Sequence, residues 1–142
     1  MGKMIGIILT GHGSFPEGLL KSVELIAGEV KQIEVIPFEE DKDSLECNIK
    51  DALKRVDTGS GVVCFTDLAG GTPFNVASAM SSTHDNVHVV GGTNSPMLLS
   101  GLFQRELAVN EFVELVMNEG KENIKQFEVK EKRQPTKDVD GI

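Results

Sequence analysis

The sequence contains no tryptophan and no tyrosine, so phenylalanine supplies all of its aromatic side chains. Platforms for stacking on bases or sugars are therefore scarce. The two cysteines, Cys47 and Cys64, form no CxxC pair, and we expect reduced thiols rather than a disulfide framework. No apolar run approaches the ~20 residues of a membrane span and no secretory signal pattern opens the chain, which predicts a cytoplasmic protein.

Positive charge is also in short supply. Lysine and arginine total 14 against 22 aspartates and glutamates, which gives a formal net charge of −8. This balance argues against nucleic acid or an anionic membrane as the main partner and favours attraction of a basic protein. A length of 142 residues suits one domain that needs no disulfide or metal to fold. We expect that domain over residues 1–132, followed by an aperiodic, flexible tail at 133–142.

Short apolar runs alternate with amphipathic segments, which indicates an open α/β sheet with right-handed crossovers. The apolar runs predict parallel strands at 4–9, 34–38, 61–66 and 86–92. The helical patterns cover 17–30, 43–56, 72–80, 95–103 and 110–125. We expect Asp43 or Ser44 to cap the second helix, and Thr72 to cap the third with Pro73 in its first turn. The alternating segment 126–132 predicts an exposed or edge strand.

Two glycine-rich loops follow the first and third predicted strands. They read TGHGSFPEG (10–18) and TDLAGGTPFN (66–75). In open α/β sheets, ligands bind beyond the carboxyl ends of the strands, at the point where the strand order reverses. If the strand order is 2-1-3-4, the two loops face each other across that point. His12 of the first loop and Asp67 of the second would then meet.

The residues of these loops suggest phosphoryl chemistry. His12 is the candidate nucleophile, and we interpret the flanking Gly11 and Gly13 as removing bulk so that a phosphoryl group can approach the ring. Asp67 would accept a hydrogen bond from one ring nitrogen, which fixes the tautomer and leaves the other nitrogen free. The bare N–H groups at a helix start suit phosphate oxygens. The predicted phosphate-binding set is Gly13, Gly70, Gly71 and Thr72.

Each signal also has an ordinary structural interpretation. A histidine between glycines is often a turn residue, an aspartate after a strand often caps a helix, and GGTP alone is a tight turn before a helix. Their convergence on neighbouring loops favours the functional interpretation. His84 and His88 are four residues apart, but their polar turn and strand contexts indicate solvated surface rather than a metal site. We expect neither a metal nor another cofactor.

Three segments carry a family resemblance: GIILTGHGSFPEGLLKSVELIAGE, FTDLAGGTPFNVAS and VVGGTNSPMLL. Together they resemble the IIA component of the mannose-family phosphotransferase system, from Ile5 to about Phe127. The resemblance implies that His12 is phosphorylated at Nε2 by the carrier protein HPr and passes the phosphate to a IIB component for sugar uptake and phosphorylation. Asp67 matches the family's partner aspartate. Thr72 stands at a serine position of the family and keeps the hydroxyl.

The resemblance also implies an assembly. It predicts a three-layer sheet of four parallel strands in order 2-1-3-4, plus a C-terminal antiparallel strand that is exchanged in a homodimer, with QFEVKEK (126–132) as the matching segment. Because the chain stops at Ile142, we expect IIB to be a separate protein, and membrane contact only indirectly through the IIC and IID transporter. The form of the first motif is closer to the N-acetylgalactosamine and gluconate branches than to the glucose and mannose branches.

Three other functions compete with this one. The phosphoryl-carrier subunit of a phosphotransferase-dependent dihydroxyacetone kinase shares the fold and the histidine. A histidine phosphatase would need arginines around the phosphate, yet Arg55, Arg105 and Arg133 all lie outside the candidate loops. A flavodoxin-like module would need aromatic side chains against the flavin, and only Phe15 and Phe74 are at hand.

The absence of an arginine clamp predicts a shallow, open site. A carrier that holds phosphate too firmly could not pass it on, so positioning would do most of the catalytic work. We expect apolar residues around such a site to dock the partner proteins. The predicted docking residues are Phe15, Leu68 and Phe74.

Overall fold

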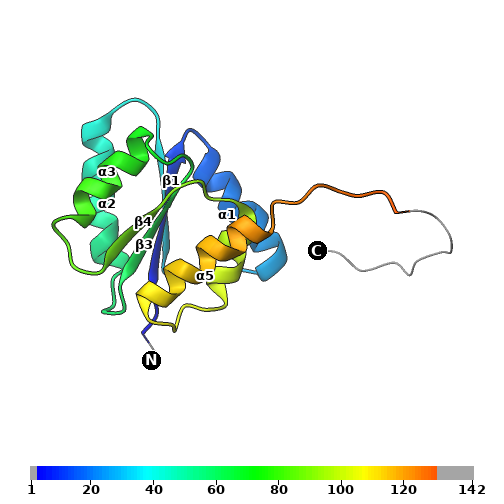
Figure 1. Cartoon of the computed structure of the whole chain (residues 1–142). Coiled ribbons are helices and arrows are strands. Elements are labelled where there is room, and N and C mark those ends of the chain that lie inside the picture. Colours follow the sequence, from blue (N-terminus) through cyan, green and yellow to red (C-terminus); the bar gives the residue numbers. More distant parts are fainter. Residues whose placement is uncertain (1–2, 131–142) are drawn as a thin grey trace.

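The computed structural model describes residues 3–130 and folds them into alternating strands and helices (Figure 1). The strands are β1 (Gly6–His12), β2 (Ile33–Phe38), β3 (Val62–Thr66) and β4 (Val87–Val90). The helices are α1 (Phe15–Ala27), α2 (Lys42–Val56), α3 (Thr72–Ser81), α4 (Ser95–Leu102) and α5 (Val109–Glu122). None of the helices within residues 3–130 is long and apolar enough to cross a membrane.

The strands form one sheet in the order β2-β1-β3-β4, with every pair parallel. This confirms the predicted 2-1-3-4 order. The chain moves outward from β1 to β2 on one side and from β3 to β4 on the other. The strand order therefore reverses between β1 and β3, where Thr10 lies opposite Thr66. The loops that follow these two strands leave the sheet side by side.

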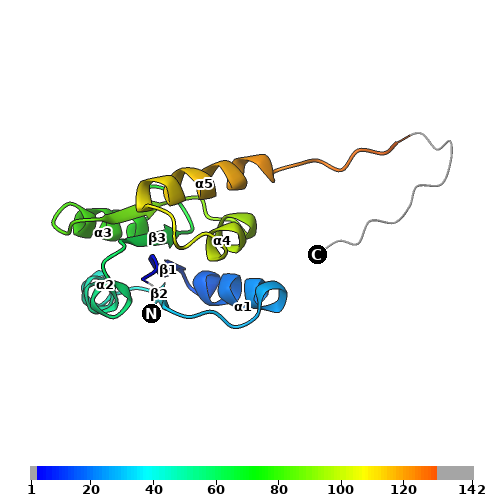
Figure 2. The same ribbon diagram turned by 90° about the horizontal axis from the view of Figure 1, so that it is seen from below.

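Helices cover both faces of the sheet, as the view along its edge shows (Figure 2). Because side chains alternate along a strand, Ile8 of β1 packs toward α2 and α3, whereas Ile7 and Leu9 pack toward α1, α4 and α5. Both faces are apolar throughout the middle of the sheet, which explains why the strands read as continuous hydrophobic runs.

Most helix boundaries differ from the expected ones by one to three residues, and two of the differences have a clear structural cause. Helix α1 ends at Ala27 rather than residue 30, because Gly28 takes a φ of +85° that an L side chain rarely adopts. Helix α2 is capped by Asp41 rather than by Asp43 or Ser44. The Asp41 carboxylate accepts hydrogen bonds from the Asp43 amide at 3.0 Å and the Ser44 amide at 3.3 Å. The acidic stretch before this helix thus supplies its cap.

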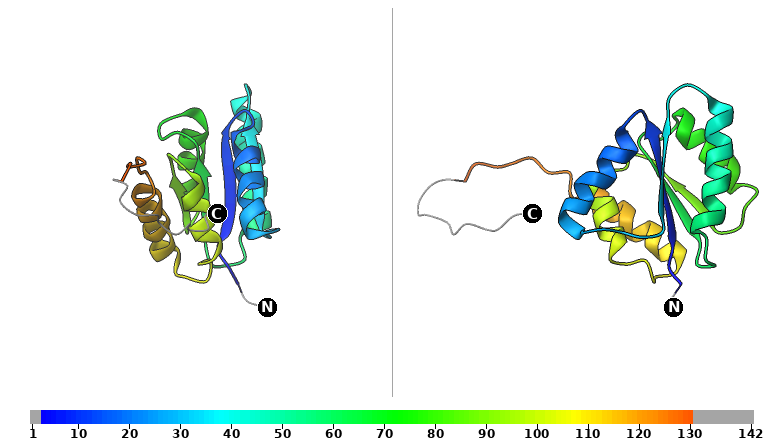
Figure 3. Two further views of the ribbon diagram at one scale, coloured as in Figure 1. Left: turned by 90° about the vertical axis from the view of Figure 1, so that its right-hand side faces the viewer. Right: turned by 180° about the vertical axis from the view of Figure 1, so that it is seen from behind.

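The segment after α5 leads away from the domain (Figure 3). Residues 126–130, the described part of the predicted strand 126–132, pair with no strand of the same chain. Its exchange with a second copy stays a prediction. The proposed domain boundary at 132 and the tail at 133–142 lie outside the described residues.

Candidate functional site

His12 and Asp67 meet at the carboxyl edge of the sheet, where β1 and β3 end. His12 is the last residue of β1 and pairs with Phe38, the last residue of β2. Strand β1 is therefore longer than the predicted 4–9, and the histidine sits on the strand's end rather than in a loop. Asp67 is the first residue after β3. The strand order alone brings the two side chains together, as the sequence predicted.

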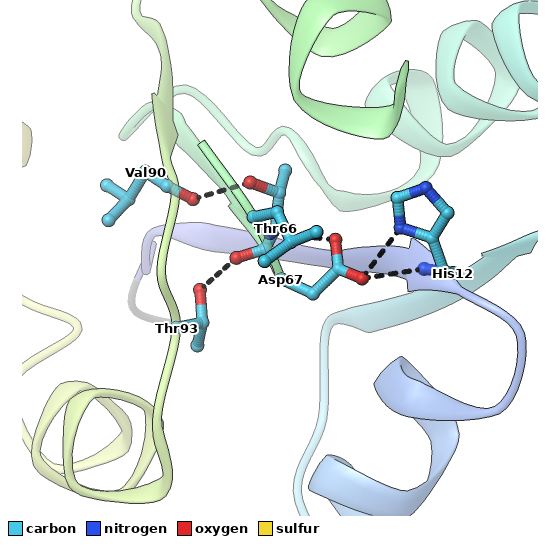
Figure 4. Close-up of polar contacts among 6 residues, drawn as sticks. His12, Thr66, Asp67, Val90 and Thr93 are labelled. Atoms are coloured by element: carbon cyan, nitrogen blue, oxygen red, sulfur yellow. Dashed lines mark hydrogen bonds and ion pairs between the residues drawn. The ribbon is translucent and has the colours of Figure 1, made fainter. Parts of the chain in front are cut away.

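One carboxylate oxygen of Asp67 holds both the backbone and the ring of His12. Asp67 Oδ2 accepts a hydrogen bond from the His12 amide at 2.9 Å and contacts ring Nδ1 at 2.9 Å. The other oxygen, Oδ1, accepts the Leu68 amide at 2.8 Å. Figure 4 shows the second ring nitrogen of His12 pointing away from the carboxylate. The contacts therefore fix the ring on its Nδ1 side and leave Nε2 turned outward.

The ionisation of Asp67 defines the tautomer of His12. Burial by itself raises the pKa of the Asp67 carboxyl, but the hydrogen bonds from the His12 amide, the His12 ring and the Leu68 amide outweigh it, and the pKa is lowered. Asp67 is thus a carboxylate at neutral pH and can only accept hydrogen bonds. Nδ1 of His12 must carry the proton, so in the neutral ring Nε2 holds a free lone pair.

The ring of His12 is exposed on one side and packed on the other. Its side chain is 47% exposed, whereas that of Asp67 is 10% exposed. The ring meets Phe38 edge-on, with centroids 5.7 Å apart and planes at 83°. Phe38 was not among the predicted site residues. The signal was present, because the run 34–38 ends on an aromatic residue and lies beside β1 in the 2-1-3-4 order.

The two glycines beside His12 have roles that differ from the sequence-based interpretation. A Cβ on Gly11 would lie 3.0 Å from Asp67 Cγ and 3.0 Å from a ring carbon of Phe15, so Gly11 makes room for the carboxylate rather than for a phosphoryl group. Gly13 has open space around it but a φ of +57°. Its amide donates to the Phe38 carbonyl at 2.8 Å and is not free for a phosphate.

The start of α3 lies against the ring of His12. A Cβ built on Gly71 would lie 3.2 Å from His12 Cε1, the ring carbon between the two nitrogens. Gly71 is also the residue that caps α3, with extended backbone angles, so Thr72 is not the cap that the sequence predicted. Thr72 is the first helical residue and Pro73 the second. Within residues 3–130, the amides of Gly70 and Thr72 donate to no protein acceptor. These N–H groups lie at the positive end of the α3 dipole.

The predicted docking residues differ in exposure. Leu68 is 58% exposed and projects from the loop after Asp67. Phe15 is half-buried against the core beneath α1, and Phe74 is half-buried beside an open hollow of about 330 Å³. Within residues 3–130, no three histidine, cysteine, aspartate or glutamate side chains gather closely enough to hold a metal ion.

Fold and site together define an α/β protein with an exposed histidine that a carboxylate holds at the sheet edge. The chain belongs to the EIIA-man family, described as "PTS system fructose IIA component", whose sequence pattern matches residues 6–119. The chain is thus assigned to the IIA components of the phosphotransferase system by family.

Individual relatives agree with this assignment. The chain is 34% identical over 130 residues to the PTS system mannose-specific EIIAB component of Escherichia coli, which covers 89% of this chain and 40% of that protein. It thus spans about two fifths of that relative's length. It is 34% identical over 105 residues to the PTS system fructose-specific EIIA component of Bacillus subtilis, which covers 72% of both chains.

A solved structure gives the same picture. The phosphotransferase system component EIIA from Streptococcus agalactiae superposes with a TM-score of 0.80 at 32% identity, covering 87% of this chain and 97% of that one. Fold and family thus rest on independent comparisons, of sequence and of structure.

Proposed function

We propose that this protein carries a phosphoryl group on Nε2 of His12, taking it from phosphorylated HPr and passing it to a IIB component of a sugar phosphotransferase system. The observation that carries the proposal is the contact between Asp67 and Nδ1, which leaves Nε2 as the free ring nitrogen at an exposed edge. We expect this phosphoryl transfer to take place in the cytoplasm and to be linked to the membrane only through the IIC and IID transporter subunits.

The transfer is balanced in bonds and charge. The Nε2 lone pair attacks the phosphorus of the donor's phosphohistidine, and the donor P–N bond breaks with its electron pair returning to the donor ring. The proton on Nδ1 of His12 stays in place, so the phosphorylated ring is cationic. The Asp67 carboxylate, 2.9 Å from Nδ1, stabilises that cation. Transfer to IIB is the same step in reverse.

The start of α3 is the proposed binding site for the phosphoryl oxygens. The Gly70 and Thr72 amides and the Thr72 hydroxyl belong to the residues on either side of Gly71, where the start of α3 approaches the Cε1 edge of the ring. Neither of the arginines in the described part of the chain is near. Arg55 pairs with Glu34, and Arg105 binds the Ile5 carbonyl at the opposite end of β1. Such a site orients the phosphoryl group without holding it firmly, as a carrier requires.

The proposal is tested by labelling with phosphoenolpyruvate, enzyme I and HPr. The wild-type chain should acquire one acid-labile phosphate, and His12→Ala should acquire none. Labelling of His12→Ala at the wild-type rate would show that another residue is the acceptor. A chain that HPr does not label, but that accepts phosphate in a dihydroxyacetone kinase system, would favour the alternative carrier function.

Asp67→Asn tests the role of the carboxylate. Removing a charged hydrogen bond to the cationic ring should cost about 2 kcal/mol in the transition state, which is about a 30-fold slower transfer. Glu34→Gln, which changes a carboxylate at an exposed ion pair with Arg55, is the matched control and should leave the rate unchanged. Equal transfer rates for Asp67→Asn and wild type would show that the Asp67 carboxylate has no role in transfer and that Asp67 is only a turn residue.

Thr72→Ala separates two roles that the sequence could not. Because the Thr72 side chain makes no capping hydrogen bond to α3, its removal should change the free energy of unfolding by less than the ~1 kcal/mol typical of a lost cap. If its hydroxyl binds the phosphoryl group, the transfer rate should fall while stability stays near wild type. A fall in stability alone would contradict the proposed contact.

We further propose that two copies exchange the segment after α5. Ile124, Phe127 and Val129 are exposed apolar side chains on this segment, and the outer edge of β4 is open among the described residues. The hollow beside that edge is lined mainly by apolar groups, including Val89 and Met117. Analytical ultracentrifugation should give the mass of two chains, and Phe127→Asp should shift it toward one. A wild-type mass of one chain would refute the exchange.

A further inference from the structure

The ladder between β3 and β4 stops two residues before Asp67. The last paired residues are Phe65 and Val90. Thr66 would next face Gly91, but a Cβ on Gly91 would lie 2.8 Å from the Ala69 Cα, so the loop after β3 lies directly on Gly91. Strands β3 and β4 therefore diverge after Phe65 and Val90, and the Thr66 carbonyl has no ladder hydrogen bond to β4.

Thr93 replaces the missing partner with two hydrogen bonds. Its amide donates to the Thr66 carbonyl at 3.1 Å, and its hydroxyl donates to the same oxygen at 2.7 Å. In return, the Thr66 hydroxyl donates to the Val90 carbonyl at 3.1 Å. Figure 4 shows the two hydroxyl contacts next to the Asp67–His12 pair. Thr66 is 0% exposed and Thr93 is 7% exposed, so water does not compete for them.

The Thr66 carbonyl belongs to the same peptide unit as the Asp67 nitrogen. Because a peptide unit is planar, fixing that oxygen fixes the direction in which the chain enters Asp67. The Asp67 side chain leaves the backbone one bond later and must reach both the amide and Nδ1 of His12 at 2.9 Å. On the far side of Asp67, the Leu68 amide holds the other carboxylate oxygen. Thr93 is thus the side chain from β4's loop that sets the backbone from which the carboxylate projects.

We propose that Thr93 is a positioning residue for the His12–Asp67 pair. It acts through the Thr66 carbonyl and touches neither the ring nor the phosphoryl group. Its hydroxyl keeps the Asp67 carboxylate aligned with Nδ1, and so keeps the proton on Nδ1 and the lone pair on Nε2. The effect on transfer rests on the proposed carrier function, whereas the effect on the ring does not.

The test compares Thr93→Val with Thr93→Ser. Valine keeps the size of the side chain and the backbone amide but removes the hydroxyl, and serine keeps the hydroxyl. The matched control is Thr58→Val, which removes a hydroxyl that donates to the Met4 carbonyl near the start of β1. Each protein is measured well below its melting temperature for the ¹⁵N shifts of the His12 ring and for the rate of transfer from HPr.

We expect Thr93→Val to mix the two ring tautomers of His12, moving the Nδ1 and Nε2 shifts toward each other, and to slow transfer about tenfold, since misplacement of a reacting group by less than 1 Å has effects of that size. Thr93→Ser should restore both, and Thr58→Val should change neither. If valine prevents folding, Thr93→Cys takes its place. Its thiol is a weak donor, so the shifts and rate should lie between those of serine and a full loss.

Unchanged ring shifts and an unchanged rate in Thr93→Val, or in Thr93→Cys where that variant replaces it, would overturn the proposal. So would a loss that serine does not restore, because the hydroxyl would then not be the group responsible. A wild-type chain that HPr does not phosphorylate would refute the carrier function instead. The ¹⁵N comparison would still decide whether Thr93 positions the pair.

Discussion

Gly71→Ala offers a strict test of how closely the start of α3 approaches the histidine. Gly71 caps α3 with φ of −78° and ψ of 172°, angles that alanine adopts without strain. The backbone thus accepts the substitution. The added methyl carbon would stand 3.2 Å from His12 Cε1 and 3.6 Å from Leu68 Cβ. The effect of the substitution is therefore concentrated on the ring.

The size of the effect follows from that distance. Carbon atoms prefer separations of about 3.5–4.0 Å, so ring and methyl must part by about 0.3–0.8 Å. If the ring moves, the 2.9 Å contact between Nδ1 and Asp67 Oδ2 lengthens. If the loop moves, the start of α3 withdraws from the ring. We expect a tenfold loss of transfer rate, roughly, by either route, while the free energy of unfolding falls by only ~1 kcal/mol through the poorer cap.

The assay is stopped-flow or quench-flow transfer from phosphorylated HPr, together with urea unfolding of the same proteins. The control is Gly18→Ala in α1, where an added Cβ meets nothing within 4 Å. That variant should gain about 0.5–1 kcal/mol of stability from helix propensity and transfer phosphate at the wild-type rate. A Gly71→Ala protein that transfers at the wild-type rate would refute the close approach between ring and helix.

Three further predictions concern buried groups. Arg105→Met should lower the free energy of unfolding, measured by urea titration, by about 3 kcal/mol, because the buried guanidinium donates hydrogen bonds to the Ile5, Lys31 and Gln32 carbonyls and the substitution removes all three. A change near zero would contradict this. Burial raises the pKa of the Cys64 thiol to about 12, whereas Cys47 is exposed. A disulfide reagent at pH 8 should therefore modify Cys47 at once and Cys64 only on unfolding. Rapid modification of both thiols in the folded protein would show that Cys64 is accessible. The lowered pKa of Asp67 means that its contribution to stability is present above the unfolded pKa of about 3.9 and is lost as the pH falls through the lower folded pKa. The measurement is a ¹³C titration of the Asp67 carboxyl carbon. A midpoint above about 4 would show a pKa shift of the opposite sign.

The sequence predicts most of the fold because its strands are buried on both faces. Runs such as 61–66 are apolar without interruption, and the helices between them show one apolar face each, so element types and the parallel sheet follow from pattern alone. The meeting of His12 and Asp67 follows from topology, since each ends or follows one of two neighbouring parallel strands. The 2-1-3-4 order was the single assumption on which the predicted site depended.

The local errors have a common physical cause. The sequence predicts Thr72 as the cap of α3, with Pro73 in the first turn, and the motif Ser95-Pro96 opens α4 in the same way. In the structure each proline is the second helical residue, so the caps are Gly71 and Asn94, one position earlier. Proline fits either position, because no N–H of the first helical turn has a partner within the helix. Sequence pattern therefore locates the helix start only to within one residue.

Other features of the site depend on tertiary contacts that no pattern encodes. Gly11 is small because Asp67 and Phe15 pack against it, and its neighbour Gly13 is glycine because φ is positive there. Either role would give the same GHG motif. Phe38 reaches the ring only because β1 continues as far as His12 and pairs with the end of β2. These contacts become visible only when the strands are in register.

The site is asymmetric about the imidazole, and this asymmetry bears on the mechanism of the proposed phosphoryl transfer. On the Nδ1 side, the Asp67 carboxylate is itself fixed by the backbone amides of His12 and Leu68. The ring therefore cannot turn without breaking its 2.9 Å contact with a fixed carboxylate oxygen. On the other side, the start of α3 approaches the ring at Cε1, and in the proposed transfer its amides and the Thr72 hydroxyl bind the phosphoryl oxygens. The described arginines, Arg55 and Arg105, are held elsewhere by Glu34 and by the Ile5 carbonyl. A phosphoryl group there would meet a fixed nucleophile but no strong counter-charge of this chain. In the proposed carrier, the remaining stabilisation would come from the docked donor or acceptor protein, which would keep both directions of transfer close in free energy.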